Sequence, residues 1–432
     1  MTTTPPPTTL LLILDACRRD YLTPENAPFL SGLLKTGVSA SIESPPGFTQ
    51  RTTMFTGTYP DTSGNFQAFG YNPEASPFRW LRKLGPLNSL YQPRKVMFPA
   101  RLAVKKVTQW VSGHYHTDPA WIPATYLPNF EVVEDGKPIF EPGALPLTSI
   151  FDLCRDAGKS FKYLAHPISG NDDEIFQMLL DTYNNKEPHS LVFAQFSNLD
   201  ERGHHHGPLV PEGRRPARNQ KPADVEVMKR EIREVDRKCE AIYNAMKANY
   251  PQFAFLAIGD HGMAPVQEKV NILKELKQLP LKAGKDYVVF VNSTIAEFWF
   301  QNDRARDLIT NLLDQAPYGR IMREAERREH RVWWTHRRYG DLLFAANVGV
   351  LFWPDYFHVV EHDIKGMHGY IDKPEETTGV LASGGTLVQG PLELGNRNLV
   401  DVFPTLCNLV GVPTPPTNEG KSLIPQTVVH AP

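Results

Sequence analysis

The sequence has few cysteines and no long hydrophobic run, and both absences narrow its class. Its 432 residues include 4 cysteines, none of them in a Cys-x-x-Cys pair. A disulfide framework is therefore not expected, and the thiols should pack in the core. The apolar run at residues 10–14 is far too short to span a bilayer, and no other stretch reaches that length without charges. We expect no membrane partner.

The sequence also lacks a recognisable signal peptide, and neither positive nor negative charge is in large excess. It begins MTTTPPPTT, without a positive segment or an apolar segment, so residues 1–8 are expected to form a disordered tail. The formal net charge is -2, which gives no indication of a nucleic-acid partner. With these signals missing, the cytoplasm is the expected location.

Short, fully apolar runs alternate with helical patterns along the chain. A run of this kind is typical of a strand buried on both faces of a parallel sheet. The pattern therefore predicts an α/β fold, with a mostly parallel central sheet and helices on both faces. The runs occupy residues 10–14, 160–164, 190–196 and 253–258, and helical patterns occupy residues 172–183 and 223–249.

Two stretches interrupt this alternation. Residues 66–145 are rich in Pro, Trp and Tyr with little periodicity, which indicates an irregular insertion. Residues 276–345 combine strand-like runs with a helical pattern, which predicts a small α+β cap. The catalytic core would then comprise residues 9–275 and 346–432. The basic run at 323–338 either meets an anionic substrate or forms a solvated helix face.

Acidic residues follow three of the predicted strands. Asp15, Asp200 and Asp260 each come shortly after an apolar run. The carboxyl ends of parallel strands meet at one edge of a sheet, so the three carboxylates should lie close together. Crowded carboxylates repel each other unless a cation neutralises them. The pattern therefore predicts bound metal.

Histidines complete this set. His204 lies four residues after Asp200 in NLDERGHHHGP, His261 follows Asp260 between two glycines, and His368 lies in KGMHGY. Mixed carboxylate and imidazole ligands favour zinc, manganese or iron over calcium. Six ligands can form two sites of three, and two ions clamp a phosphoryl group during its displacement. We expect two divalent ions, zinc first and manganese as the alternative.

These motifs stand in a recognisable order along the chain. They are LLLILDACRRDYL, ENAPFLSGLLKTGV, RTTMFTGTYPDTSGN, NLDERGHHHGP, IGDHGM, KGMHGY and VDVFPTLCNLVGVPTPPTNEGKSL. With them the sequence resembles the alkaline phosphatase superfamily, and within it the nucleotide pyrophosphatase/phosphodiesterase branch, which is related to sulfatases. The resemblance implies an alkaline phosphatase-like core and a metal-dependent phosphoric ester hydrolase that acts on a small phosphorylated or nucleotide-like substrate.

The resemblance also assigns roles to the ligands. It implies that one metal is held by Asp200, His204 and His368. It implies that the other is held by Asp15, Asp260 and His261, together with the oxygen of the nucleophile.

The nucleophile departs from the family pattern. Counting back from Thr56 at the family's usual distance reaches Gly47, which has no nucleophilic side chain. Thr49 is the nearest hydroxyl, and we predict it as the catalytic nucleophile and an additional metal ligand. Metal coordination would lower the pKa of its hydroxyl, which would attack phosphorus and form a covalent phospho-enzyme. Gln50 and Arg51 are predicted to bind the substrate.

Several alternatives remain open. A phosphomonoesterase, a phosphonate hydrolase or a sulfatase-like hydrolase would fit the same ligands. Arg51 matches the arginine of the sulfatase motif, but the Cys or Ser of that motif is missing. The displaced nucleophile also fits an inactive homologue that only binds metal.

Overall fold

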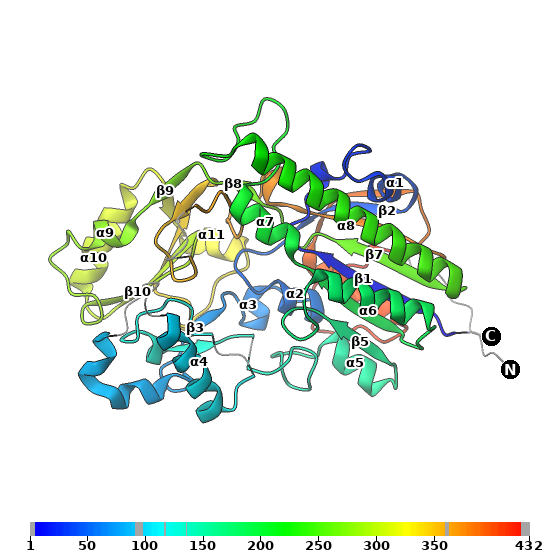
Figure 1. Cartoon of the computed structure of the whole chain (residues 1–432). Coiled ribbons are helices and arrows are strands. Elements are labelled where there is room, and N and C mark those ends of the chain that lie inside the picture. Colours follow the sequence, from blue (N-terminus) through cyan, green and yellow to red (C-terminus); the bar gives the residue numbers. More distant parts are fainter. Residues whose placement is uncertain (1–4, 91–97, 116–117, 135, 359–362, 425–432) are drawn as a thin grey trace.

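A computed structural model describes residues 5–90, 98–115, 118–134, 136–358 and 363–424. Its main feature is a seven-stranded sheet, to the right in Figure 1. Of the expected tail, residues 1–4 lie outside the described part of the chain. Thr8 belongs to the first strand instead, because it pairs with Phe253 on the neighbouring strand and is buried. The strands are, in sheet order, β17 (Leu392–Asn398), β2 (Val38–Glu43), β16 (Gly379–Gly384), β7 (Phe253–Ile258), β1 (Thr8–Leu14), β6 (Leu191–Phe196) and β5 (Phe161–Leu164).

The sheet is mostly parallel. Strands β5, β6, β1 and β7 run parallel to one another, β17 is parallel to β2, and only β16 is antiparallel to its neighbours β7 and β2. The predicted α/β class is confirmed. The four predicted apolar runs all form strands of this sheet. Strands β1, β6 and β7 are buried along their whole length, whereas β5, at the edge of the sheet, is only partly buried.

Helices cover both faces of the sheet. Along β1, Leu10, Leu12 and Leu14 pack in one apolar cluster, whereas Leu11 and Ile13 pack in another. This alternation follows from the two-residue period of a strand. The first cluster is completed by α1 (Pro28–Thr36), α6 (Asp172–Asn184) and α8 (Pro222–Asn249), and the second by α2 (Gln50–Thr56), α5 (Ile150–Asp156) and α12 (Val402–Val410).

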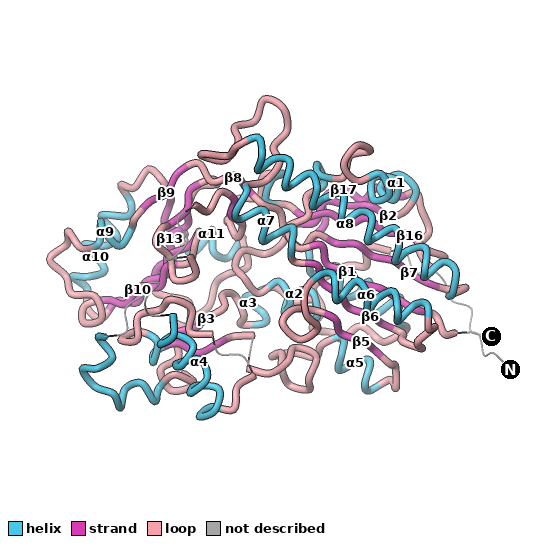
Figure 2. The backbone as a smooth tube through the Cα atoms, in the orientation of Figure 1, coloured by secondary structure: helices cyan, strands magenta, loops and turns pink. Residues whose placement is uncertain are grey.

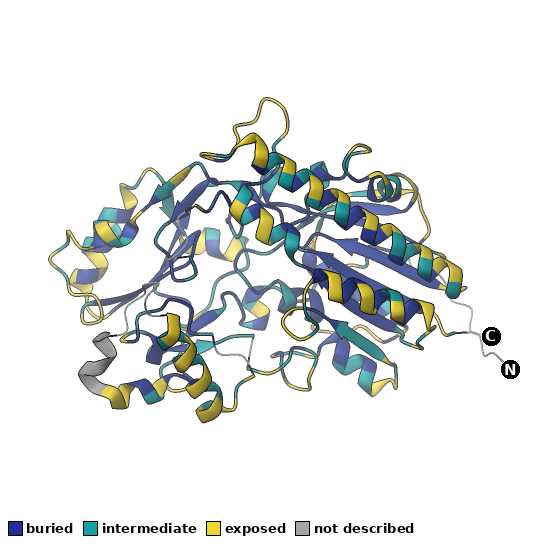
Figure 3. Cartoon of the chain, viewed as in Figure 1, coloured by how far each residue is buried: buried dark blue, intermediate teal, exposed yellow. Residues whose placement is uncertain are grey.

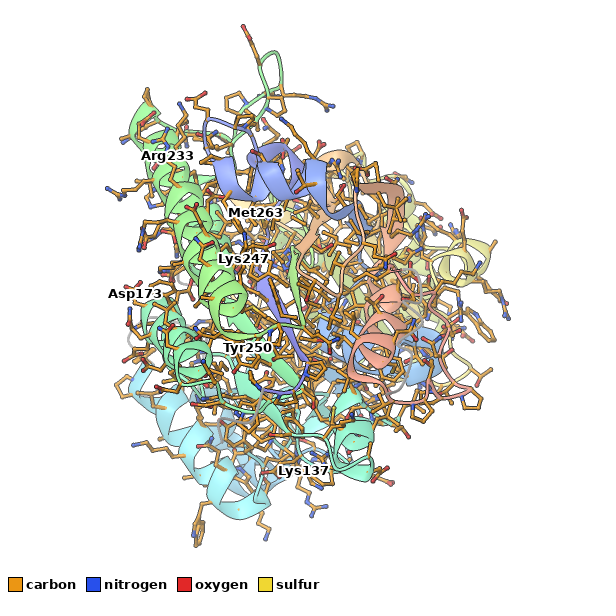
Figure 4. All side chains as sticks on the ribbon, turned by 90° about the vertical axis from the view of Figure 1, so that its right-hand side faces the viewer. Lys137, Asp173, Arg233, Lys247, Tyr250 and Met263 are labelled. Atoms are coloured by element: carbon orange, nitrogen blue, oxygen red, sulfur yellow. The ribbon has the colours of Figure 1, made fainter. Side chains whose placement is uncertain are left out.

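The outer faces of the helices are polar. Figure 3 shows the buried strands in dark blue beneath helices with exposed outer sides. Figure 4 shows Arg233 and Lys247 along α8 and Asp173 on the neighbouring α6. The two helices are joined by an ion pair of 2.6 Å between Lys238 Nζ and Asp173 Oδ1.

A second sheet lies at the opposite end of the molecule (Figure 2). It has four antiparallel strands in the order β10 (Tyr287–Val291), β11 (Ile295–Phe300), β13 (Leu342–Ala346) and β12 (Gly319–Ile321). Helix α10 (Asp303–Asp314) buries Ala305, Ile309 and Leu313 against it, and α11 (Glu324–Glu329) follows β12. These elements lie within the stretch expected to form a cap, except that β13 extends one residue beyond it, to Ala346.

The stretch at 66–145 is more regular than its sequence suggested. It contains the two-stranded antiparallel sheet of β3 (Phe69–Tyr71) and β4 (Phe130–Val132), the 3-10 segment η2 (Arg79–Leu90) and the 15-residue helix α4 (Phe98–Ser112). The expectation of irregular structure is therefore wrong for α4. Its apolar residues do not form an inward stripe, which is the signal that predicts a helix.

The basic run at 323–338 is neutralised within the protein. Arg331 contacts Asp61 at 2.6 Å and Glu419 at 2.5 Å, and Arg338 contacts Glu131 at 2.6 Å. The arginines of this run form ion pairs that connect the second sheet to neighbouring segments. This arrangement does not support the alternative that the run contacts an anionic substrate.

Candidate metal centre

The predicted ligands come together at the carboxyl ends of three adjacent strands. Asp15 directly follows β1, Asp260 and His261 follow β7, and Asp200 lies in the first turn of α7 (Asn198–His206), which follows β6. His368 belongs to a segment that is distant along the sequence. The short strand β15 (Gly366–Met367) pairs with β8 (Ala264–Pro265), and this pairing brings His368 next to the end of β7.

The side chains are in close contact. His261 Nε2 lies 3.2 Å from Asp15 Oδ1, and His204 Nε2 lies 3.3 Å from Asp200 Oδ2. His368 Nε2 lies 3.6 Å from Asp200 Oδ1. The ring of His261 stacks on that of His368, with centroids 3.8 Å apart and an interplanar angle of 9°. The structure thus brings all six predicted ligands into one cluster.

Two groups of three have spacing suited to one ion each. Candidate ligand atoms of Asp200, His261 and His368 lie within 4.8 Å of one another, and so do those of Asp15, Asp260 and His261. The resemblance had put His204 in the first group, but His261 fills that place and belongs to both. His204 stays beside Asp200, so the six residues form one continuous rim.

Backbone carbonyls fix two of the rings. His204 Nδ1 donates to the Gly366 carbonyl at 2.9 Å, and His261 Nδ1 donates to the Gly262 carbonyl at 2.9 Å. Since a carbonyl accepts only, each Nδ1 carries the hydrogen, and each Nε2 is directed at the carboxylates. Metal-binding imidazoles are commonly oriented in this way.

Protons balance the charges of this cluster. Burial, together with the nearby Asp15 and Asp200, raises the pKa of Asp260 to about 7, against the opposing effect of His261. Burial alone would lower the pKa of His261, but Asp260, Asp15 and Asp200 outweigh it and raise that pKa to about 10. A charged imidazolium therefore sits among three carboxylates.

The other site residues respond to the same charges. Burial opposes ionisation of Asp200, but His204, His368 and His261 hold its pKa well below the usual range. Burial and the charge of His261 lower the pKa of His368 far below that of a free imidazole. The cluster therefore stabilises positive charge at one edge and keeps a neutral ring at the other.

The donor set fits divalent metal ions. Asp200 Oδ1 and His368 Nδ1 are buried and have no hydrogen-bond partner within the described segments. An unpaired buried polar atom is costly, and a bound cation would satisfy it. Mixed carboxylate and imidazole donors suit zinc or manganese.

A cavity of roughly 260 Å³ opens onto this cluster. Gln50 and Arg51, predicted to bind substrate, both line it. Arg51 Nη2 donates to Gln195 Oε1 at 3.1 Å, and Gln195 Nε2 donates to Asp15 Oδ2 at 2.7 Å. The remaining lining residues are Phe48, Ala68, Glu134, Asp15, Asp200, Asp260, His261 and His368.

The predicted nucleophile lies beside this cavity but does not line it. Thr49 precedes α2, is 3% exposed, and donates its hydroxyl to the Asn65 carbonyl at 3.1 Å. Its neighbours Phe48 and Gln50 both reach the cavity.

The structure explains the glycine at the family's nucleophile position. Gly47 has a φ of +100°, and a Cβ there would lie 2.1 Å from the Phe66 carbonyl oxygen. That carbonyl accepts from the Phe48 amide at 2.9 Å, so it cannot easily move away. Any side chain at position 47 would clash with this backbone.

Two site residues were not predicted from the sequence. Gln195 links Arg51 to Asp15, and Glu134 accepts hydrogen bonds from the amide and hydroxyl of Thr52. A polar residue near the end of an apolar strand could have indicated Gln195. Glu134 belongs to the stretch at 66–145, and no local pattern marks it.

Three comparisons with known proteins bear on the site. Residues 9–371 match the family model for type I phosphodiesterase / nucleotide pyrophosphatase. No curated protein matches the chain. Among solved structures, human ectonucleotide pyrophosphatase/phosphodiesterase 5 aligns with a TM-score of 0.64 and 16% identity, over 96% of this chain and 97% of that chain. An inactive variant of the murine protein, in complex with AMP, aligns with a TM-score of 0.64 and 16% identity, over 95% and 96%. These structures share the fold of this chain.

Proposed function

The chain belongs to the type I phosphodiesterase and nucleotide pyrophosphatase family and is a hydrolase of phosphoric diester bonds, and from this premise we propose that it cleaves nucleotide-like phosphodiesters with two divalent metal ions. Zinc is the first expectation and manganese the second. The ions would be held by Asp15, Asp200, His204, Asp260, His261 and His368.

One observation carries the proposal. Three carboxylates share one rim with an imidazolium between them, and a buried carboxylate oxygen and a buried imidazole nitrogen have no hydrogen-bond partner among the described residues. A structural ion-pair network would satisfy those atoms. A pair of cations would satisfy them, neutralise the carboxylates and offset the charge of a phosphate group.

The other cavity residues have roles that follow from their contacts. Arg51 faces the cavity and is held by Gln195, so its guanidinium is positioned to donate to phosphate oxygens. Gln50 can donate its amide to the same group, although in the free protein this amide donates to the Gly47 carbonyl at 2.9 Å. Bound metal would supply neutralising charge and lower the pKa of a coordinated hydroxyl.

We propose Thr49 as the nucleophile that forms the covalent intermediate. Its hydroxyl must first leave the Asn65 carbonyl by rotation about χ1, which costs one buried hydrogen bond. A specific observation favours a second route, direct attack by water. Among the residues that the structure describes, no Ser, Thr or Cys side chain lines the cavity at the metal centre.

The substrate class rests on the family and on a relative. The murine structure contains AMP, and a nucleoside monophosphate is one product of cleaving a nucleotide diester or pyrophosphate. We therefore propose that one of the two groups esterified to the phosphate in the substrate of this chain is also nucleotide-like.

A substrate panel tests the proposed function. Purified protein with zinc or manganese would be given bis-p-nitrophenyl phosphate, p-nitrophenyl phosphate and p-nitrophenyl sulfate. We expect preferred turnover of the diester. Preference for the monoester or the sulfate would reject the diesterase assignment, and failure to turn over any of them would identify an inactive metal-binding homologue.

The nucleophile is tested separately with Thr49→Ala and Thr49→Ser. If Thr49 attacks phosphorus, Thr49→Ala loses roughly 10³-fold or more in kcat, Thr49→Ser retains part of the rate, and mass spectrometry of the wild type detects a covalent adduct on residue 49. Undiminished activity of Thr49→Ala would reject this role and leave the water route.

A further inference from the structure

Helix α4 (Phe98–Ser112) turns its apolar side toward solvent. The only one of its side chains that is fully buried is Thr108, whose hydroxyl accepts from Trp80 Nε1 at 3.0 Å. By contrast, Trp110 is 86% exposed, the most exposed of the large apolar side chains in the described residues. The other large apolar side chains exposed on α4 are Phe98, Leu102, Val107 and Val111. The polarity of this helix is therefore inverted relative to an ordinary surface helix.

These side chains form one continuous surface, the α4 patch, consisting of Leu102, Lys106, Val107, Trp110 and Val111. At 100° per residue they cover one side of the helix, with Trp110 near its centre. Contiguous exposed apolar surface of this kind marks an interaction site. Exposed large apolar residues elsewhere, such as Met178 on α6, are scattered and isolated.

The charge around the patch has one sign. The sequence between Glu74 and Asp118 contains no acidic residue. Lys106 is exposed within the patch, and Lys83 is exposed on η2. Arg101 and Lys105 lie on the inner side of α4, where both contact Asp118, at 2.7 Å and 3.7 Å. The outward surface thus combines apolar side chains with unopposed positive charge.

The position of α4 at the edge of the molecule leaves it accessible to a partner with a flat surface. It lies along the lower rim of the molecule in both Figure 1 and Figure 4, where its ribbon is cyan. The exposed side of α4 is convex. It can lie against a planar bilayer, with its apolar side chains packed among the acyl chains. A Trp at the centre of an exposed apolar surface, with a Lys beside it, is typical of a helix that lies in the lipid headgroup region.

A second copy of the chain fits this surface less well. A two-fold interface would place the α4 patch of one protomer on that of its partner. The interface would then bring together Lys83 and Lys106 of both protomers, with no acidic residue between positions 74 and 118 to compensate them. The absence of negative charge favours a negatively charged partner instead.

We propose that α4 is an interfacial helix that docks the protein on membranes containing anionic lipid. Trp110 and its apolar neighbours would enter the headgroup region, and Lys106 and Lys83 would contact lipid phosphates. This replaces the sequence-based expectation of no membrane partner. The docking is independent of the proposed catalytic function, because no residue of α4 lines the cavity at the metal centre.

Vesicle flotation of the full chain tests the proposal. Vesicles of phosphatidylcholine alone would be compared with vesicles that also contain phosphatidylserine. We expect binding to the anionic vesicles only, weakened by salt. Each cation near the surface contributes about fivefold in partitioning, so Lys106→Glu, which changes the charge by two, should weaken binding about 25-fold. Trp110→Ser should also weaken it severalfold.

Matched variants separate this site from general surface effects. Met178→Ser on α6 and Lys247→Glu on α8 remove an exposed apolar residue and an exposed cation elsewhere, and both should bind like wild type. Trp110→Phe should keep binding but lose the vesicle-induced blue shift in fluorescence that Trp110 provides. All the substituted positions are exposed on helices, so circular dichroism should be unchanged.

Three results would overturn the proposal. One is a folded wild type that fails to bind anionic vesicles. Another is equal loss of binding in the control variants. The third is a wild-type dimer in light scattering that Trp110→Ser converts to a monomer while vesicle binding is absent, which would assign the patch to a second copy of the chain.

Discussion

In the protein without metal, protons on individual residues of the candidate metal centre offset the negative charge of its carboxylates. His261, with its pKa raised to about 10, is positively charged at neutral pH, and Asp260, with its pKa raised to about 7, is partly protonated there. A bound metal ion would take the positions of these protons, since a metal binds deprotonated ligands.

Zinc binding should therefore release protons. Because His261 must lose its proton and Asp260 loses its remaining share, the apparent zinc affinity should rise with pH, most steeply below about 7, where both groups hold protons, and less steeply from there to about 10, where only His261 does. Calorimetric titrations in two buffers with different ionisation enthalpies measure this release directly. Heat that does not depend on the buffer, with pH-independent affinity, would contradict the assignment of these residues as ligands.

Gln195 is a positioning residue in this scheme. Gln195→Leu removes its hydrogen bonds to Asp15 and to Arg51 while keeping an apolar side chain of similar size. We expect zinc affinity to fall about 10- to 100-fold, as for other residues that orient metal ligands. Gln278→Leu, at an exposed position, serves as the control and should bind zinc normally. Unchanged affinity in Gln195→Leu would show that Asp15 needs no such support.

The residues that could be predicted are those with a local signature. Asp200 and His204 share one helix, and Asp260 and His261 are adjacent, so their proximity follows from the sequence alone. The arrangement of His261 between two groups, the hydroxyl contact of Thr49 and the link through Gln195 depend on side chains from separate elements, and no local pattern encodes them.

At the scale of elements, one carboxylate connects the two segments that carry three of the predicted ligands. Asp224, in the first turn of α8, accepts from His206 Nδ1 at 2.8 Å and from Lys365 Nζ at 3.0 Å. His206 ends α7, the helix of Asp200 and His204, and the Lys365 amide donates to the His204 carbonyl at 2.7 Å. Asp224 therefore fixes α7 relative to the segment that leads to His368.

Asp224→Asn should lower both stability and metal affinity. Burial opposes ionisation of Asp224, but His206, the Lys221 amide and Lys365 outweigh it and lower its pKa to about 2. A depressed pKa contributes stability above the unfolded value near 4, and that stability is lost as pH falls through about 2. We expect a loss of about 1–3 kcal/mol in urea unfolding at neutral pH, and a smaller difference from wild type as pH approaches 2. A difference that does not change with pH would contradict the ionic role.

The elements themselves were predictable where burial imposes a pattern. Strand β7 spans the predicted residues 253–258, and helices α6 and α8 match their predicted ranges to within one residue at each end. Helix α4 was missed because its apolar side chains face solvent, and the strands β2, β16 and β17 were missed because their residues are less uniformly apolar.

At the scale of the whole molecule, the second sheet supports the metal centre from a distance. We propose that residues 276–345 act as a cap. None of them lines the cavity at the metal centre, yet Thr294, in the turn between β10 and β11, donates to the Gly369 carbonyl at 2.9 Å. This contact holds the residue next to His368. No helix in the described ranges is both long and apolar enough to traverse a bilayer.

The central claim is that two metal ions in this cluster enable hydrolysis of a phosphodiester. It is tested most directly by titrating zinc into chelator-treated protein while measuring bound metal and turnover of bis-p-nitrophenyl phosphate. We expect activity to be absent without metal and to rise until two equivalents are bound per chain. We also expect Asp200→Asn and His368→Ala to bind less zinc and to lose the activity. Full activity in protein free of metal, or two bound equivalents with no turnover of any phosphate ester, would contradict it.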